Sequence, residues 1–453
     1  MYITKKKNIS GKVFKSISKN KSKKTHIINK FVTNKSITNK SITNKSITNK
    51  SVTNKQKTLR IIFEHSQSLE NDAKVYENVF NKYNYKIDFK IIKNLYHNTI
   101  EKYYDVNLFL EQLPSKCKKY FPSKYNLFMP NNELFIDTKE DNKNQSKNRY
   151  DRYEELKSIN IILCKTQICY KFFNFIKNEK NPNNHKTIYS YQTVYTKFTT
   201  NIMKELQYDS GDSSTDSKID PNLFIHLAGK SSFKNTLDLV YCWIKNNGFL
   251  NIDPDIRLVI TCYGHCLKWF RPNLKYFYKY DFDKDENVKM DKQNNIATFK
   301  NMTIHFKPIE SVKEYTDLLK HANVAICISN KEGYGHYINE ARYMKKFIIT
   351  MDYPPMNEMI INCNTDKDNK QTGITKCNGI LLKKRNKFSK QKYKETKFDF
   401  YEAFPDMNEL RDSIIWCIKH KHDLHKYGEN GRKMFDDDKQ YFEDLIEKNV
   451  KLI

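Results

Sequence analysis

The sequence predicts an α/β protein made of two successive Rossmann-like, doubly wound domains. Short apolar runs alternate with helical patterns from about residue 58 onwards, and one polar stretch ending in proline interrupts this alternation. The chain has 453 residues, of which 38% are hydrophobic, so it can supply two cores. Strands that alternate with helices favour parallel sheets covered by helices on both faces.

The first domain is expected over residues 58–206. Strands are expected where apolar residues run together or alternate, and helices where they recur at helical spacing. The expected strands are 59–63, 85–92, 106–110, 125–129, 159–164 and 187–191. The expected helices are 68–83 and 166–177, and residues 137–150, rich in Asn, Lys and Asp, are expected to form an inserted loop.

The second domain is expected over residues 222–404, after a linker at 207–221 that is polar and ends in Pro221. The expected strands are 223–228, 257–262, 303–306, 324–329, 347–351 and 378–382. The expected helices are 235–246, 312–321 and 336–345. Residues 405–453 are expected to form C-terminal helices that cross back to the first domain, with 407–450 wholly helical.

The net charge of +28 is concentrated in a low-complexity tail. Residues 1–57 contain 16 Lys and no acidic residue, whereas the rest of the chain has 64 basic and 52 acidic residues. Five tandem pentapeptides of the type Ser-Ile-Thr-Asn-Lys fill residues 31–55, and their period fits neither helix nor strand, so we expect disorder. A basic tail could hold RNA, another polyanion or an acidic surface, and a repeat expansion without a fixed role explains it equally well.

Composition also limits the class of protein. The 10 cysteines include no Cys-x2-Cys pair, and a disulfide framework is not expected at this length, so reduced, mostly buried thiols are expected and no metal site. No apolar run approaches the ~18–20 residues that span a bilayer, and the first residues lack the apolar stretch of a secretory signal. A cytoplasmic location is therefore expected.

Candidate site residues follow the expected strand at 324–329. Two glutamates stand with seven residues between them in the run Glu332-Gly333-Tyr334-Gly335-His-Tyr-Ile-Asn-Glu340. A strand, a glycine turn and a helix start are expected here at the carboxyl edge of a parallel sheet, where open α/β sheets bind ligands. The glycines allow close backbone approach, and the free N–H groups of a helix start can receive a phosphate or sugar hydroxyls.

The two carboxylates add hydrogen-bond acceptors to that edge. Glu332 and Glu340 can each accept from vicinal hydroxyls, such as those of a sugar ring and of a ribose. In isolation, the same run of residues could equally form an ordinary strand-to-helix turn.

A second candidate segment precedes the expected helix 235–246. It runs Leu227-Ala-Gly229-Lys230-Ser-Ser-Phe-Lys234-Asn235 and places two cations just before a helix start. Lys230 and Lys234 could neutralise the charge of a leaving pyrophosphate. In a lysine-rich chain they could also be solvated surface residues.

These segments resemble the signatures of the retaining nucleotide-sugar glycosyltransferases of family 4. The family pattern is Glu-Gly-Phe-Gly followed by Glu-Ala with seven residues between the glutamates, and this chain matches it with Tyr334 in place of Phe. The segment from Gly229 to Lys234 is similar to the family's diphosphate loop. The resemblance covers roughly residues 222–445 and implies the GT-B fold, in which two Rossmann-like domains face a central cleft.

The resemblance also implies an activity and roles. It implies transfer of a sugar from a nucleoside-diphosphate sugar to a glycan, protein or lipid acceptor, with retention of the anomeric configuration and without a metal or other cofactor. The first domain would bind the acceptor. The implied catalytic residues are Glu332, on the transferred sugar, and Lys230 and Lys234, on the diphosphate. The other implied donor-binding residues are Gly229, Gly333, Tyr334, Gly335 and Glu340, the last of which would bind the ribose.

Two segments depart from the family pattern. The loop after the first strand, residues 64–68, lacks the family's Gly-Gly, and His336 stands where a small or apolar residue is commoner. Of the other histidines, His65, His97 and His185 are each expected to be structural or solvated. Two other functions stay open: another reaction of a nucleotide sugar, such as hydrolysis, or a degenerate enzyme body that serves a polyanion-binding protein.

Overall fold

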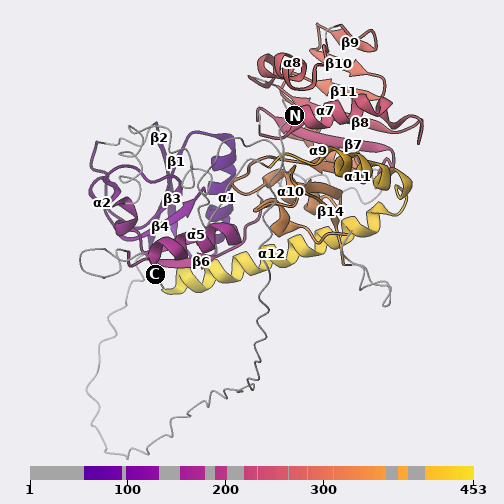
Figure 1. The fold of residues 1–453 in the computed structure, drawn as a ribbon. Coiled ribbons are helices and arrows are strands. Elements are labelled where there is room, and N and C mark those ends of the chain that lie inside the picture. Colours follow the sequence, from indigo (N-terminus) through magenta and orange to yellow (C-terminus); the bar gives the residue numbers. More distant parts are fainter. Residues whose placement is uncertain are drawn as a thin grey trace, which may run out of the picture. The chain divides into compact units, whose positions relative to one another are not determined.

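The structure, a computed structural model, describes residues 56–93, 98–131, 154–178, 189–200, 219–231, 233–263, 265–282, 284–309, 311–363, 376–385 and 403–452. Within these ranges it contains two α/β sheets, one of six and one of eight strands (Figure 1). The basic tail up to residue 55, the loop expected at 137–150 and the linker up to residue 218 lie outside the described residues.

The first sheet is wholly parallel and has the strand order β2-β1-β3-β4-β5-β6. The chain passes from β1 to β2 on one side and then crosses to β3 on the other, so the sheet has a switch point between β1 and β3. Its elements are β1 (Thr58–Glu64), α1 (Gln67–Asn81), β2 (Lys86–Ile92), β3 (Tyr104–Glu111), α2 (Cys117–Tyr120), β4 (Ser123–Pro130), η1 (Leu156–Ser158), β5 (Ile161–Cys164), α5 (Gln167–Lys177) and β6 (Gln192–Tyr195).

The second sheet has the order β14-β13-β12-β7-β8-β11-β10-β9 and is parallel except for β9 and β10. Its switch point lies at β7, which has β8 on one side and β12 on the other. Its strands are β7 (Leu223–Gly229), β8 (Arg257–Cys262), β9 (Val288–Asp291), β10 (Ile296–Phe299), β11 (Met302–His305), β12 (Val324–Cys327), β13 (Phe347–Met351) and β14 (Gly379–Leu382). Its helices are α7 (Thr236–Lys245), η2 (Asn247–Phe249), α8 (His265–Tyr278), α9 (Val312–His321), α10 (His336–Tyr343) and η3 (Met356–Met359).

The buried side chains of the first sheet form a separate cluster on each of its two faces. Ile61 and Ile62 are neighbours in β1, yet they belong to different buried clusters, because successive side chains of a strand point to opposite faces. The same division holds for Leu108 and Phe109 in β3. A strand that is covered on both faces has no alternation of buried and exposed residues, and every residue of β12 and β13 is buried.

Helix starts follow the expected capping chemistry. Ser66, Thr166 and Ser311 each precede a helix and accept a hydrogen bond from a backbone N–H in its first turn, at 3.3, 3.2 and 3.0 Å. Each hydroxyl satisfies one of the four N–H groups that a helix start leaves unpaired.

The expected sixth strand of the first sheet was placed wrongly. It was expected at 187–191, but β6 is Gln192–Tyr195. Tyr191 precedes the strand, is fully buried, and donates its hydroxyl to the Phe173 carbonyl at 2.9 Å. The apolar pattern therefore marked a segment that fills the core, whereas the edge strand beside it contains the polar residues Gln192 and Thr193.

Helix α8 and strands β9 and β10 were not expected from the sequence. Helix α8 contains Pro272, and β9 and β10 are only four residues long, so the helical and the strand patterns are both weak there. A turn joins the two strands, where the Asp291 carboxylate accepts from the backbone N–H of Asn294 at 3.0 Å. The C-terminal region is also not wholly helical, because residues 420–423 separate α11 (Met407–Lys419) from α12 (Leu424–Leu452).

One pair of cysteines departs from the expected reduced state. Cys363 and Cys377 form a disulfide with their Cα atoms 5.0 Å apart. Backbone pairing brings them together, because Cys363 N–H donates to Gly379 at 2.9 Å and Asn378 N–H donates to Ile361 at 3.1 Å. The remaining cysteines whose side chains the structure describes are buried.

Helix α12 contacts elements of both sheets. Its Asp438 accepts from Arg342 of α10 at 2.7 Å and also pairs with Lys197, just after β6. Its Glu443 pairs with Lys82, at the end of α1, at 2.7 Å. In the described part of the chain, no helix is long and apolar enough to cross a membrane.

Candidate functional site

The two candidate segments follow neighbouring parallel strands of the second sheet. Strand β7 pairs with β12 in the register Phe224 opposite Val324, so the loops after both strands leave the sheet at the same edge. The loops also bond to each other, because Asn330 N–H donates to the Phe233 carbonyl at 2.7 Å. The pairing of β7 with β12 therefore brings the predicted lysine and glutamate segments into contact.

The turn before α10 depends on its two glycines. Gly335 has φ 98° at the start of the helix, a left-handed conformation that side chains rarely adopt. A Cβ on Gly333 would lie 2.4 Å from Oδ1 of Asn131, the residue after β4. A side chain at position 333 would therefore displace the contact between this turn and the first sheet.

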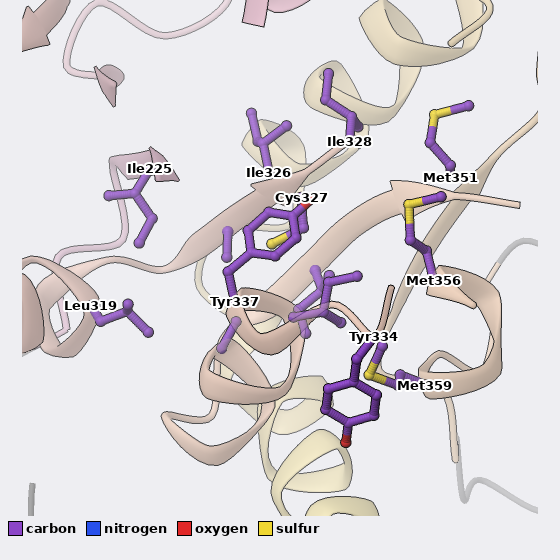
Figure 2. Close-up of a cluster of buried hydrophobic side chains, with 14 of the residues drawn as sticks. Ile225, Leu319, Ile326, Cys327, Ile328, Tyr334, Tyr337, Met351, Met356 and Met359 are labelled. Carbon is purple, nitrogen blue, oxygen red and sulfur yellow. The ribbon is translucent and has the colours of Figure 1, made fainter. Parts of the chain in front are cut away.

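Tyr334 lies in the core, 6% exposed. Its hydroxyl donates to the Phe198 carbonyl at 2.8 Å and accepts from the Asn339 amide at 2.9 Å. Figure 2 shows Tyr334 and Tyr337 among the buried residues around β12 and α10. The structure thus uses the Tyr334 side chain to anchor the turn, and any ligand contact at this position falls to the backbone.

Glu332 and Lys234 are brought together as an ion pair. Oε1 of Glu332 accepts hydrogen bonds from Nζ of Lys234 and from Oγ of Ser329. Their side chains are only 12% and 14% exposed. Nζ of Lys234 also lies 3.7 Å from the ring centroid of Tyr337. We call Lys234, Ser329, Glu332 and Tyr337 the glutamate–lysine cluster. Lys230 is exposed at the end of β7, next to Gly229, which has φ 60°.

Tyr337 completes a relay of hydroxyl groups within this cluster. Its hydroxyl lies 2.5 Å from Oγ of Ser329. Burial raises the pKa of Tyr337, and so does the nearby Glu332, so the phenol stays protonated. Since the Ser329 proton is directed to Glu332, Tyr337 is the donor to Ser329.

Glu340 lies on α10 and is held by a different element. Its Oε2 accepts from the hydroxyl of Tyr315, on α9, at 2.5 Å. Burial and the adjacent Glu340 raise the pKa of Tyr315, so this phenol also remains a donor. The two predicted glutamates are thus fixed separately, Glu332 by Lys234 and Ser329, and Glu340 by Tyr315.

A buried histidine lies beneath the two loops. His226 of β7 has Nδ1 2.7 Å from the Ile326 carbonyl and Nε2 3.0 Å from Oγ1 of Thr236. Burial lowers its pKa to about 4, so the ring is neutral at pH 7. Because a carbonyl can only accept, Nδ1 carries the proton and Nε2 accepts from Thr236. The ring therefore joins β7, β12 and the start of α7.

A triad of side chains around a buried carboxylate connects the turn to the first sheet. Asp72 of α1 is 2% exposed and lies 3.0 Å from Nζ of Lys165 and 3.2 Å from Nε2 of His336. Burial raises the pKa of the Asp72 carboxyl, but the charges and hydrogen bonds of Lys165 and His336 outweigh burial and hold that pKa below its usual range. The sequence showed that His336 was unusual, but nothing local to it indicated these partners.

Glu111 and Asn131 were missed in the sequence. Glu111, at the end of β3, has φ 68° inside a three-residue turn closed by a 2.8 Å bond from Gln112 N–H to the Leu110 carbonyl, a rare and strained geometry. The Asn131 amide donates to its carboxylate at 2.5 Å. Glu111 is the last residue of β3 and Asn131 follows β4 directly, and that position at the carboxyl edge of parallel strands was a usable signal.

Of the other histidines that the sequence analysis named, the structure describes only His65. His65 is 78% exposed and pairs with Glu70 at 2.9 Å, while His97 and His185 lie outside the described residues. Within the ranges that the structure describes, no cluster of three or more His, Cys, Asp or Glu side chains is placed to hold a metal ion.

Comparison with known proteins establishes the fold. No protein-family model matches the sequence, and no curated protein matches it either. Among solved structures, the chain is similar to a sucrose-phosphate synthase from Thermosynechococcus elongatus, with a TM-score of 0.54 and 10% identity over 87% of this chain and 98% of that one. It is also similar to a trehalose-6-phosphate synthase, with a TM-score of 0.50 and 7% identity over 77% and 74% of the two chains. The predicted GT-B-like class of two Rossmann-like sheets is confirmed.

Asp72→Asn is expected to lower the free energy of unfolding by about 3–5 kcal/mol, because it leaves Lys165 buried without its counter-ion. The folded protein holds the pKa of Asp72 below its unfolded value of about 4. The stability that the triad contributes is therefore present above about pH 4 and is lost as pH falls through the lower, folded pKa. Urea denaturation of wild type and variant from pH 3 to pH 7 measures both effects.

The control replaces both buried charges with apolar groups. Asp72→Leu combined with Lys165→Met should recover part of the loss, since no unpaired ion remains. A change below about 1 kcal/mol in the Asp72→Asn single variant at pH 7 would show that the triad does not tie the turn to the first sheet.

Proposed function

We propose that this chain is a glycosyltransferase that moves a sugar from a nucleoside-diphosphate sugar to an acceptor hydroxyl with retention of the anomeric configuration. The observation that carries the proposal is the convergence of Lys234 and Glu332 at the carboxyl edge of β7 and β12, with Lys230 in the same loop as Lys234. This edge is the switch point of the second sheet, where open α/β sheets bind ligands.

The diphosphate would bind where cations and free N–H groups gather. Lys230 and Lys234 precede α7, and α10 begins at His336 without a side-chain cap on its first N–H groups. A helix N-terminus favours negative charge, and cations stabilise the charge that develops on the leaving diphosphate as the bond to the sugar breaks. These groups would supply that stabilisation from the protein itself.

The two glutamates would each bind a different part of the donor beyond the diphosphate. Glu332, beside Lys234, would accept hydrogen bonds from the transferred sugar, and Glu340 would accept from the ribose, with Tyr315 orienting its carboxylate. Retention is proposed from the motif resemblance and from the solved structure of trehalose-6-phosphate synthase, whose title describes glycosyl transfer with retention. No side chain is proposed as a covalent nucleophile.

A panel of nucleotide sugars tests the proposal. The protein is incubated with uridine, guanosine and adenosine diphosphate sugars, and the released nucleoside diphosphate and the sugar product are measured. Release from at least one donor is expected, with the sugar recovered as a glycoside when acceptors are supplied. Free sugar as the sole product would instead support hydrolysis, and no release or binding with any donor would contradict an enzyme of nucleotide sugars.

Substitution of each glutamate should affect the binding of a different part of the ligand. Glu340→Ala is expected to weaken binding of both the nucleoside diphosphate and the nucleotide sugar. Glu332→Ala is expected to weaken only the sugar-bearing ligand. Each loss is expected at about 5-fold to 100-fold, from about 1–3 kcal/mol for a buried hydroxyl left unpaired.

Calorimetric titration of both variants with both ligands gives the comparison. Equal losses for both ligands in both variants would indicate a folding defect. No loss in any of the four titrations would mean that the glutamates only stabilise a structural turn.

The lysines should act on the diphosphate. Lys230→Ala and Lys234→Ala together are expected to lower turnover and to weaken diphosphate binding by about 10-fold to 100-fold for each lysine, from about 1.5–3 kcal/mol per charge-assisted hydrogen bond. Lys292→Ala, which removes an exposed lysine at the turn after β9, is the matched control. Unchanged affinity of the double variant for the nucleoside diphosphate would show that both lysines are solvated surface residues that do not bind it.

A further inference from the structure

We propose that the Glu332–Lys234 ion pair makes the site favour an intact nucleotide sugar over the bare nucleoside diphosphate that remains after transfer. This inference rests on the proposed function and adds a specificity to it. Each member of the pair is needed by a different part of the donor, and in the structure the two side chains bond to each other.

The pair is largely shielded from water. The side chains of Lys234 and Glu332 are 14% and 12% exposed, and they bond directly although they are 98 residues apart in the sequence. The ring of Tyr337 lies 3.7 Å from the Lys234 ammonium and stabilises the cation in this position. Lys234 therefore has two favourable partners that a diphosphate must replace.

A bare diphosphate would disturb this arrangement at a cost. If Lys234 turns to the phosphates, Glu332 keeps only the hydroxyl of Ser329 as a neutral donor within the cluster. A carboxylate with little access to water that loses its counter-ion is destabilised, because neither solvent nor a cation compensates its charge. The cost of leaving Glu332 without its counter-ion then offsets part of the free energy gained from the contact between Lys234 and the phosphates.

An intact donor would avoid that cost. The hydroxyls of its sugar can donate to Glu332 as Lys234 moves to the diphosphate, so both members of the pair gain new partners at once. The Ser329 donor is held by Tyr337 at 2.5 Å and can stay in place throughout. The pair therefore couples recognition of the diphosphate to the presence of the sugar, and it favours release of the product.

Removal of the Glu332 carboxylate is expected to tighten the binding of a bare diphosphate, whereas removal of an ordinary binding residue would weaken it. Glu332→Gln keeps the shape of the side chain but frees Lys234, so it is expected to bind inorganic pyrophosphate about tenfold more tightly than wild type does. In the Lys234→Met background the same Glu332→Gln change is expected to have little effect, because no lysine remains to be freed. Glu332→Ala is the second variant, with the same expectation, in case Glu332→Gln does not fold.

The experiment is a four-protein calorimetric titration with inorganic pyrophosphate. It compares wild type, Glu332→Gln, Lys234→Met and the double variant, so that the pairwise contribution is isolated. Glu429→Gln, which removes an exposed carboxylate of α12 that pairs with Lys345, is the control for a change of net charge. Tighter binding in Glu332→Gln that disappears in the double variant supports the inference.

The remaining outcomes overturn the inference and separate it from the proposed function. Equal or weaker pyrophosphate binding by Glu332→Gln, with binding by wild type, overturns the inference alone. Tightening that persists without Lys234 also overturns it, because it would then be general electrostatics. No binding by wild type and by Glu332→Gln at millimolar pyrophosphate would remove the diphosphate site itself, and with it the proposed function.

Discussion

The pairing of β7 with β12 is the constraint on which the candidate site depends. It joins strands about 100 residues apart in the sequence and makes their loops leave the sheet at one edge. Because β8 lies on the other side of β7, this edge is also the point where the chain changes direction across the sheet. Parallel pairing thus places the loop with Lys234 and the loop with Glu332 side by side. The hydrogen bond from the Asn330 N–H to the Phe233 carbonyl holds these two loops together.

The turn that carries Glu332 is held from both sheets. Tyr334 bonds to Phe198, Gly333 lies against Asn131, and His336 pairs with the buried Asp72, all on segments of the first sheet. Removing one partner of a buried ion pair leaves the other charge without compensation, so this arrangement of the turn is sensitive to the loss of either partner. The precision of the proposed donor site therefore depends on residues that would never touch the donor.

Local pattern was sufficient for most of the fold, including the strand and the helix on either side of the turn that contains Glu332. Buried strands such as β12 and β13 are marked by continuous apolar residues, and α9 begins at a serine cap that the sequence shows. Local pattern failed where an edge strand is polar, as in β6 and β9. It also could not predict contacts between residues far apart in the sequence. The contact of Glu332 with Lys234 and that of Glu340 with Tyr315 depend on which strands pair, and the neighbouring residues in the sequence do not indicate that pairing.

The central claim is that a nucleoside diphosphate binds at the carboxyl edge of β7 and β12. The most direct test is a crystal structure of the protein with the nucleoside diphosphate that it releases most readily. The account predicts the ribose hydroxyls on Glu340, the phosphates beside Lys230, Lys234 and the start of α10, and the Glu332–Lys234 pair opened. A nucleotide bound at any other edge of either sheet, or an intact pair beside bound diphosphate, would contradict it.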